Sequence, residues 1–79
     1  MNMDLGSWST RVAAAIRAEM ASQRRTSEAL ARVLGVTEPT VAARLGGEIP
    51  FDLVELERVA DWLGLAPSEL VARADQPAA

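Results

Sequence analysis

Apolar residues recur at three- and four-residue steps along most of the chain, and short breaks interrupt this pattern at regular intervals. Such spacing is typical of amphipathic helices, because 3.6 residues complete one helical turn. The sequence contains no sustained alternation of apolar and polar residues, the pattern that would indicate strands. The pattern therefore predicts an all-α protein, a compact domain of five helices.

The interruptions indicate where the helices begin and end. Ser9, Thr26, Thr37 and Asp52 have side chains that can cap a helix N-terminus, and Glu55 completes a capping-box pattern with Asp52. Glycine follows the second, third and fourth predicted helices, where a chain leaves the helical conformation most easily. We expect helices at about 10–23, 27–34, 37–45, 53–63 and 67–74.

Each predicted helix has one apolar face, and these faces supply the candidate core. The residues expected to point inward are Val12, Ala15, Ile16, Met20, Leu30, Ala31, Leu34, Val41, Leu45, Leu53, Leu56, Val59, Ala60, Leu63, Leu70 and Val71. With 79 residues the chain is long enough for one small core. We therefore predict one domain at 9–74, preceded by a loose arm at 1–8 and followed by a disordered tail at 75–79.

The composition argues against an enzyme. The chain has no histidine and no cysteine, so it lacks the commonest general base, the thiol nucleophile and the preferred zinc ligands. Four acids lie close together in sequence, at Asp52, Glu55, Glu57 and Asp61, but we interpret them as a solvated helix face. We expect no catalysis, cofactor, metal or small-molecule substrate.

A signal peptide and an apolar run of about 18 residues are both missing, which predicts a cytoplasmic protein without membrane contact.

Charge is distributed unevenly along the chain. Residues 9–47 hold six arginines and three acids, whereas residues 48–79 hold two arginines and seven acids. The net charge of −3 therefore conceals a basic part that could attract a polyanion. The alternative is that two helical surfaces simply differ in charge, without a binding role.

Residues 26–45 have the features of a helix-turn-helix, two short helices joined by a turn of three or four residues. Ala31 is small enough for the helices to approach, and Gly35 gives the turn its backbone freedom. Val36, Val41 and Leu45 would anchor the second helix and leave its other face outward. In this motif the second helix enters the major groove of DNA.

The chain resembles the Cro/cI-type, lambda-repressor-like helix-turn-helix family over about residues 10–73. The segments that carry the likeness are TSEALA at 26–31, LGVTEPTV at 34–41, LGG at 45–47, PF at 50–51, ELERVA at 55–60 and PSEL at 67–70. The resemblance implies five helices, no enzymatic activity, and a homodimer on a pseudo-palindromic operator in double-stranded DNA.

Five residues of the second motif helix are candidates for reading bases: Glu38, Pro39, Thr40, Ala43 and Arg44. Glutamate can accept from cytosine, and the threonine methyl, proline or alanine can contact a thymine methyl. Arg44 is the only long donor on this helix and could reach guanine or phosphate. Each has a structural alternative, since Glu38 and Pro39 also suit the first turn of a helix and Thr40 could simply be solvated.

Another five residues are candidates for contacting phosphates: Arg24, Arg25, Thr26, Ser27 and Gly46. Arginine beside a helix N-terminus opposes the helix dipole unless an anion binds there. The sequence departs from the family here. The family commonly has glycine and an apolar residue where this chain has Arg24 and Arg25, and glutamine where it has Ser27. It also usually has glutamine or serine at the 38 and 39 positions, and a longer polar residue at 43.

The expected function is that of a phage- or prophage-type transcriptional repressor, Cro-like because so short a chain leaves no room for a second domain. An antitoxin or an operon autoregulator fits the sequence equally well. A protein-interaction module that retains the fold but has lost base reading is the alternative from another class. For the homodimer we expect contacts near Trp62, Leu65 or the residues around Phe51, and Trp8 is a further candidate.

Overall fold

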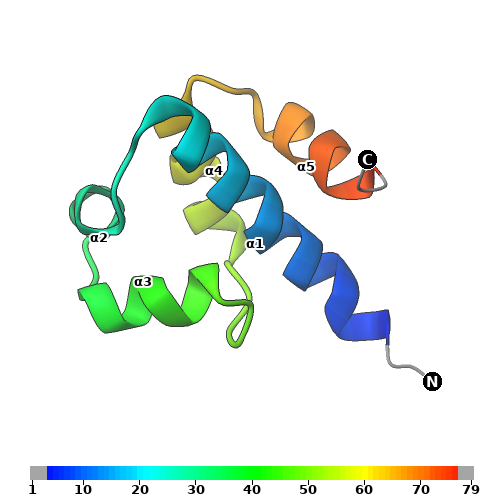
Figure 1. Ribbon diagram of the computed structural model, residues 1–79, viewed down its shortest axis with the longest axis horizontal. Coiled ribbons are helices and arrows are strands. Elements are labelled where there is room, and N and C mark those ends of the chain that lie inside the picture. The colour runs from blue at the N-terminus through cyan, green and yellow to red at the C-terminus, as the bar shows by residue number, and fades with distance from the viewer. Residues whose placement is uncertain (1–3, 77–79) are drawn as a thin grey trace.

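The computed structural model describes residues 4–76, which form five helices and no strand (Figure 1). The helices are α1 (Asp4–Gln23), α2 (Ser27–Leu34), α3 (Glu38–Leu45), α4 (Leu53–Leu63) and α5 (Pro67–Asp75). The predicted all-α architecture of five helices is confirmed. No helix within this range combines the length and the apolarity that crossing a membrane requires.

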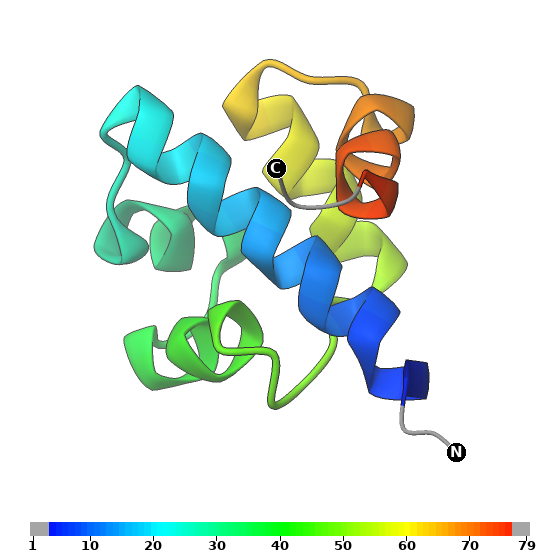
Figure 2. The same ribbon diagram turned by 45° about the vertical axis from the view of Figure 1, so that its right-hand side comes forward.

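Helix α1 lies across the other helices and joins them into one core (Figure 2). It packs against α3, α4 and α5, while α2 packs against α3 and α4. The buried apolar residues come from all five helices and from the loop before α4: Val12, Ala13, Ile16, Met20, Leu30, Ala31, Leu34, Val41, Leu45, Phe51, Val59, Ala60, Leu63, Leu70 and Ala74. None of the polar residues in the described range is fully buried, so hydrophobic burial holds the fold together.

The helix ends follow the local signals in the sequence. The hydroxyl of Thr26 accepts from the Ala29 amide, and the hydroxyl of Thr37 accepts from the Thr40 amide. Asp52 forms the predicted capping box, whose reciprocal hydrogen bonds are described with the site below. Helices α2 and α4 end at glycines in the left-handed conformation, with φ of 69° and 76°. At these ends the sequence prediction is confirmed.

The first helix is longer than its sequence pattern predicts. It begins at Asp4 rather than at Thr10, so residues 4–8 of the expected arm are helical. The reason is tertiary: Trp8 Nε1 donates to Asp75 Oδ1 at 3.1 Å, and Arg11 Nε donates to the Ala74 carbonyl at 3.0 Å. The predicted tail is likewise wrong at Asp75, which ends α5 and accepts the Trp8 bond. The rest of the predicted arm at 1–3, and of the tail at 77–79, lies outside the described residues.

The apolar face of α4 is also only partly buried, contrary to expectation. Val59, Ala60 and Leu63 are in the core, but Leu56 is half-buried and Leu53 is 83% exposed. Only the second half of α4 lies over the core, so the stripe of apolar residues extends beyond it.

Candidate nucleic-acid interface

Helices α2 and α3 are joined by a three-residue turn at 35–37. Gly35 has the left-handed backbone (φ 69°, ψ 33°) that lets the chain turn away from α2. Its neighbour Val36 packs against the core, and the Val36 amide donates to the Ala31 carbonyl at 3.1 Å. This is the arrangement of elements that a helix-turn-helix requires.

Helix α3 is anchored along one face and exposed along the opposite face. Val41 is fully buried and Leu45 is 8% exposed. The exposed positions are Glu38, Pro39 and Ala42, which share one side of the helix because Ala42 follows the other two by four and three residues. A helix in this setting can present that side to a partner.

The candidates for base reading divide between these two faces. Glu38 and Pro39 lie on the exposed face, whereas Thr40 and Ala43 are half-buried. The hydroxyl of Thr40 is hydrogen-bonded to the hydroxyl of Thr37 at 3.0 Å, which stabilises the first turn of α3. Sequence reasoning did not include Ala42 among the candidates for base reading, although its position one turn after Glu38 predicts that it lies on the same exposed face.

Arg44 is engaged within the protein. Its Nε and Nη2 donate to the two carboxylate oxygens of Glu55, at 3.0 and 3.3 Å. The side chains of the pair are only 18% and 12% exposed, so solvent screens the interaction weakly. Glu55 Oε1 also accepts from the Asp52 amide at 2.9 Å, and Asp52 Oδ1 accepts from the Glu55 amide at 2.7 Å. The capping box of α4 is therefore connected directly to the C-terminal end of α3.

A second arginine reaches the same end of α3. Arg17 on α1 donates through Nη1 to the Leu45 carbonyl, one of the last carbonyls of the helix. Arg17 is exposed, and the periodicity of its own helix does not reveal which carbonyl lies within reach of its guanidinium. Gly46, a candidate for phosphate contact, already donates its amide to the Ala42 carbonyl at 2.9 Å.

The remaining candidates for phosphate contact lie between α1 and α2 and are all exposed. Arg24 has φ of 57°, a left-handed backbone that side chains rarely adopt. Arg25 stacks over Trp62, with its guanidinium carbon 4.8 Å from the ring centroid, and donates to the Trp62 carbonyl at 3.1 Å. Thr26 caps α2 and Ser27 begins it. The arginines thus adjoin the N-terminus of α2, where positive charge is favourable only if an anion is present.

The four acids that lie close together in sequence, from Asp52 to Asp61, divide into two pairs in the structure. Asp52 and Glu55 bond to each other's backbone in the capping box, while Glu57 and Asp61 are exposed on α4. Among the described side chains, no three that could ligate a metal ion lie together.

Comparison with known proteins produced one match. The family model described as the BetR domain matches residues 7–79, which includes every helix except the beginning of α1. Neither the curated proteins nor the solved structures contain a significant match to the chain.

Proposed function

The chain belongs to the BetR domain family, and from this premise and the geometry of α2 and α3 we propose that it is a sequence-specific DNA-binding regulator of transcription. In the proposal α3 enters the major groove, and the protein acts without catalysis or cofactor. Its resemblance to the Cro/cI type extends the proposal to a repressor of phage or prophage type. Such a repressor would bind a pseudo-palindromic operator as a homodimer.

One observation carries this proposal: α3 is anchored from one side and free on the other, within a helix-turn-helix arrangement. Val41 and Leu45 hold the helix, and Glu38, Pro39 and Ala42 face outward. Helices in this position read base edges through residues of their N-terminal part. Glu38 could accept from cytosine, and the small apolar surfaces of Pro39 and Ala42 suit thymine methyl groups.

The arginines next to α2 would supply the non-specific part of the affinity. Arg24 and Arg25 are both exposed at the junction of α1 and α2, and Arg32 is exposed further along α2. In this motif the first helix crosses the sugar-phosphate backbone. Arg25 is held against Trp62, which fixes the direction of its charge and reduces the entropy lost on binding.

A specific observation favours a second candidate, a protein-interaction module or antitoxin-like regulator with weak DNA reading. The exposed face of α3 carries one acid and no base, because Glu38 is its only charged residue and Arg44 is paired with Glu55. A face of this kind gains little from the phosphate backbone. The two candidates therefore predict different behaviour towards DNA.

An electrophoretic mobility shift with the DNA upstream of the protein's own gene separates these candidates, at low salt and with random competitor. We expect a shift that survives the competitor. Arg24→Ala and Arg25→Ala should each weaken binding to all sequences and flatten the plot of log affinity against log salt by about one unit per lost contact in each protomer.

Glu38→Ala and Thr40→Ala should leave that salt slope unchanged and alter which operator positions matter. Each lost base contact should remove about 1–3 kcal/mol of discrimination between sequences. If Arg44→Ala alone abolishes the preference, Arg44 leaves Glu55 on DNA and is the base reader. If none of the five substitutions changes binding, this face does not contact DNA and the interaction module is the better description.

A further inference from the structure

Helix α3 presents a partner with one polar side chain that is free of internal bonds. Its three polar residues are Glu38, Thr40 and Arg44, and two of them are engaged within the protein. The hydroxyl of Thr40 is bonded to that of Thr37, and Arg44 is paired with Glu55. Glu38 is exposed and has no hydrogen bond or ion pair with any other described residue. The helix therefore offers a carboxylate, a group that only accepts hydrogen bonds when it is ionised.

An apolar surface lies directly beside this carboxylate. Pro39 and Ala42 are both exposed, and they follow Glu38 by one and four residues. Residues three or four apart are neighbours on a helix, so Ala42 adjoins both Glu38 and Pro39. The side chain of alanine is a single methyl group, which allows a base edge to approach α3 closely. We call these three residues the reading face.

The base edges in the major groove differ in how well they match a lone acceptor. Guanine presents only acceptors there, N7 and O6, and needs a donor such as arginine. The amino group of adenine lies between two acceptors, its own N7 and O4 of the paired thymine, and both repel a carboxylate. The amino group of cytosine has an acceptor on one side only, O6 of the paired guanine. Cytosine is therefore the base that suits Glu38 best.

The apolar part of the reading face narrows the choice further. On the other side of the cytosine amino group is ring carbon C5, which carries a hydrogen in ordinary cytosine and a methyl group in 5-methylcytosine. A donor and a methyl group are then attached to adjacent ring atoms. In a thymine–adenine pair the methyl group and the amino group are separated by O4 of thymine. Among these bases, 5-methylcytosine is thus the one that matches a carboxylate with an apolar surface beside it.

We propose that the reading face recognises 5-methylcytosine in double-stranded DNA. Glu38 accepts from the N4 amino group of this base, and Pro39 and Ala42 contact its methyl group. The inference rests on the proposed function, since it requires α3 to lie in the major groove, and it deepens that function by naming the base. It also agrees with the pairing of Arg44 with Glu55, which engages the side chain of α3 best suited to guanine.

Selection from three pools of randomised duplex DNA tests the proposal without a known operator. The pools contain the same sequences, made with ordinary cytosine, 5-methylcytosine or N4-methylcytosine, and each pool carries its own tag. They compete for the full chain in one binding reaction, and the bound fraction is sequenced.

The wild type should enrich the 5-methylcytosine pool over the unmodified pool. We expect about fourfold enrichment for each methyl group contacted, the factor that follows from burying one such group. N4-methylcytosine should give no gain, because its methyl group replaces the amino hydrogen that points into the groove. Glu38 then has no donor to accept from.

Two variants of α3 test the two parts of the reading face. Ala42→Ser replaces a methyl group by a hydroxymethyl group and should reduce the preference for the 5-methylcytosine pool. Glu38→Gln should shift the selected base towards adenine, because glutamine can donate to N7 and accept from the N6 amino group. A variant that only lost stability would bind less of all three pools and leave their ratio unchanged.

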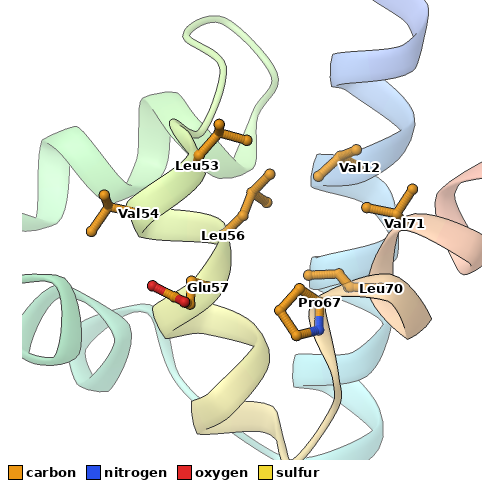
Figure 3. A pocket seen from close by; sticks show the side chains of 8 residues that line it. All are labelled: Val12, Leu53, Val54, Leu56, Glu57, Pro67, Leu70 and Val71. Carbon is orange, nitrogen blue, oxygen red and sulfur yellow. The ribbon is translucent and has the colours of Figure 1, made fainter.

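Ala72→Ser on α5 and Glu57→Gln on α4 are the matched controls, since they make the same changes at exposed positions. Helix α5 does not pack against α3. Glu57 follows Glu55 by two residues and so points away from the side of α4 that holds Arg44. It lines a groove between α4 and α5 instead (Figure 3). Both controls should retain the wild-type preference.

The inference and the proposed function can fail separately. If the wild type selects a common sequence equally from the unmodified and the 5-methylcytosine pools, the inference is wrong and the DNA-binding function stands. Equal gains from the two methylated pools would also overturn the inference, because the methyl group would then act without the amino group. If no pool yields a common sequence, the proposed function falls and the inference falls with it.

Discussion

Helices α3 and α4 are neighbours in the chain, but different interactions define their ends. Helix α4 is bounded by signals in its own sequence, a capping box at Asp52 and Glu55 and a left-handed glycine at Gly64. Helix α3 has a side-chain cap only at its beginning. At its C-terminal end the following backbone amides bond to its last carbonyls, and two side-chain interactions with other elements add to them: Arg17 from α1 donates to the Leu45 carbonyl, and Arg44 is bonded to Glu55. The helix that we propose to read DNA is thus positioned by the rest of the fold, as precise binding geometry demands.

The largest effect on stability is expected within α4, where the first turn is exposed and the last turn is buried. Leu63 is 4% exposed and Leu53 is 83% exposed, on the same stripe of the same helix. Leu63→Ala should lower the free energy of unfolding by about 2–5 kcal/mol, because it removes buried methyl groups and leaves a cavity. For a domain this small, such a loss is a large part of the total free energy of unfolding.

Leu53→Ala is the control, with the same change in side chain at an exposed site. Its free energy of unfolding, measured in urea at a protein concentration low enough to exclude dimers, should differ from that of the wild type by no more than about 0.5 kcal/mol. Equal losses for the two variants would mean that the stripe of α4 is buried along its whole length.

The link between α3 and α4 should have the next largest effect. Arg44→Met removes the partner of a carboxylate that is only 12% exposed, so we expect the free energy of unfolding to fall by about 2 kcal/mol. Glu55→Gln in the Arg44→Met background should recover part of this loss. The neutral amide needs no cation, and its oxygen can still accept from the Asp52 amide.

A double-mutant cycle at Arg44 and Glu55 measures their coupling. Additive effects would show that the pair contributes no interaction free energy to the link between α3 and α4. Arg17 offers a comparison in the same region, since its bond to Leu45 does not involve Glu55.

The smallest expected effect on stability is at Arg24, in the segment just before the helix-turn-helix. Arg24 has φ of 57°, and a side chain in this conformation costs roughly 1 kcal/mol relative to glycine. Arg24→Gly should therefore raise the melting temperature by about 4–8 °C. The same change should weaken DNA binding if Arg24 contacts phosphate. Arg24→Ala removes the charge but keeps the backbone strain, so a comparable gain in stability for Arg24→Ala would argue against strain as the cause.

Local interactions explain where sequence reasoning succeeded and failed. Thr26, Thr37 and Asp52 cap helices by bonds that span three residues, so their roles could be predicted from neighbouring residues alone. The start of α1 could not be predicted in this way, because it depends on contacts of Trp8 and Arg11 with the end of α5, more than 60 residues away in the chain.

The candidate interface divides in the same way. Glu38 and Pro39 were predicted on α3 and lie on its exposed face. Arg44 looked equally available, because nothing in the periodicity of α3 reveals that Glu55 faces it across the loop. Helix periodicity gives the direction of a side chain relative to its own helix, but not the group that occupies the space it enters.

By itself, the sequence determined the number of helices, most of their ends and most of the core. These depend on turn periodicity, capping and glycine conformation, all of which act within a few residues. The tertiary structure alone decided that α1 begins at Asp4, that Arg17 and Arg44 hold the end of α3, and that Leu53 remains outside the core. These features arise where helices distant in sequence meet, and their packing is set by the shapes of all the surfaces together.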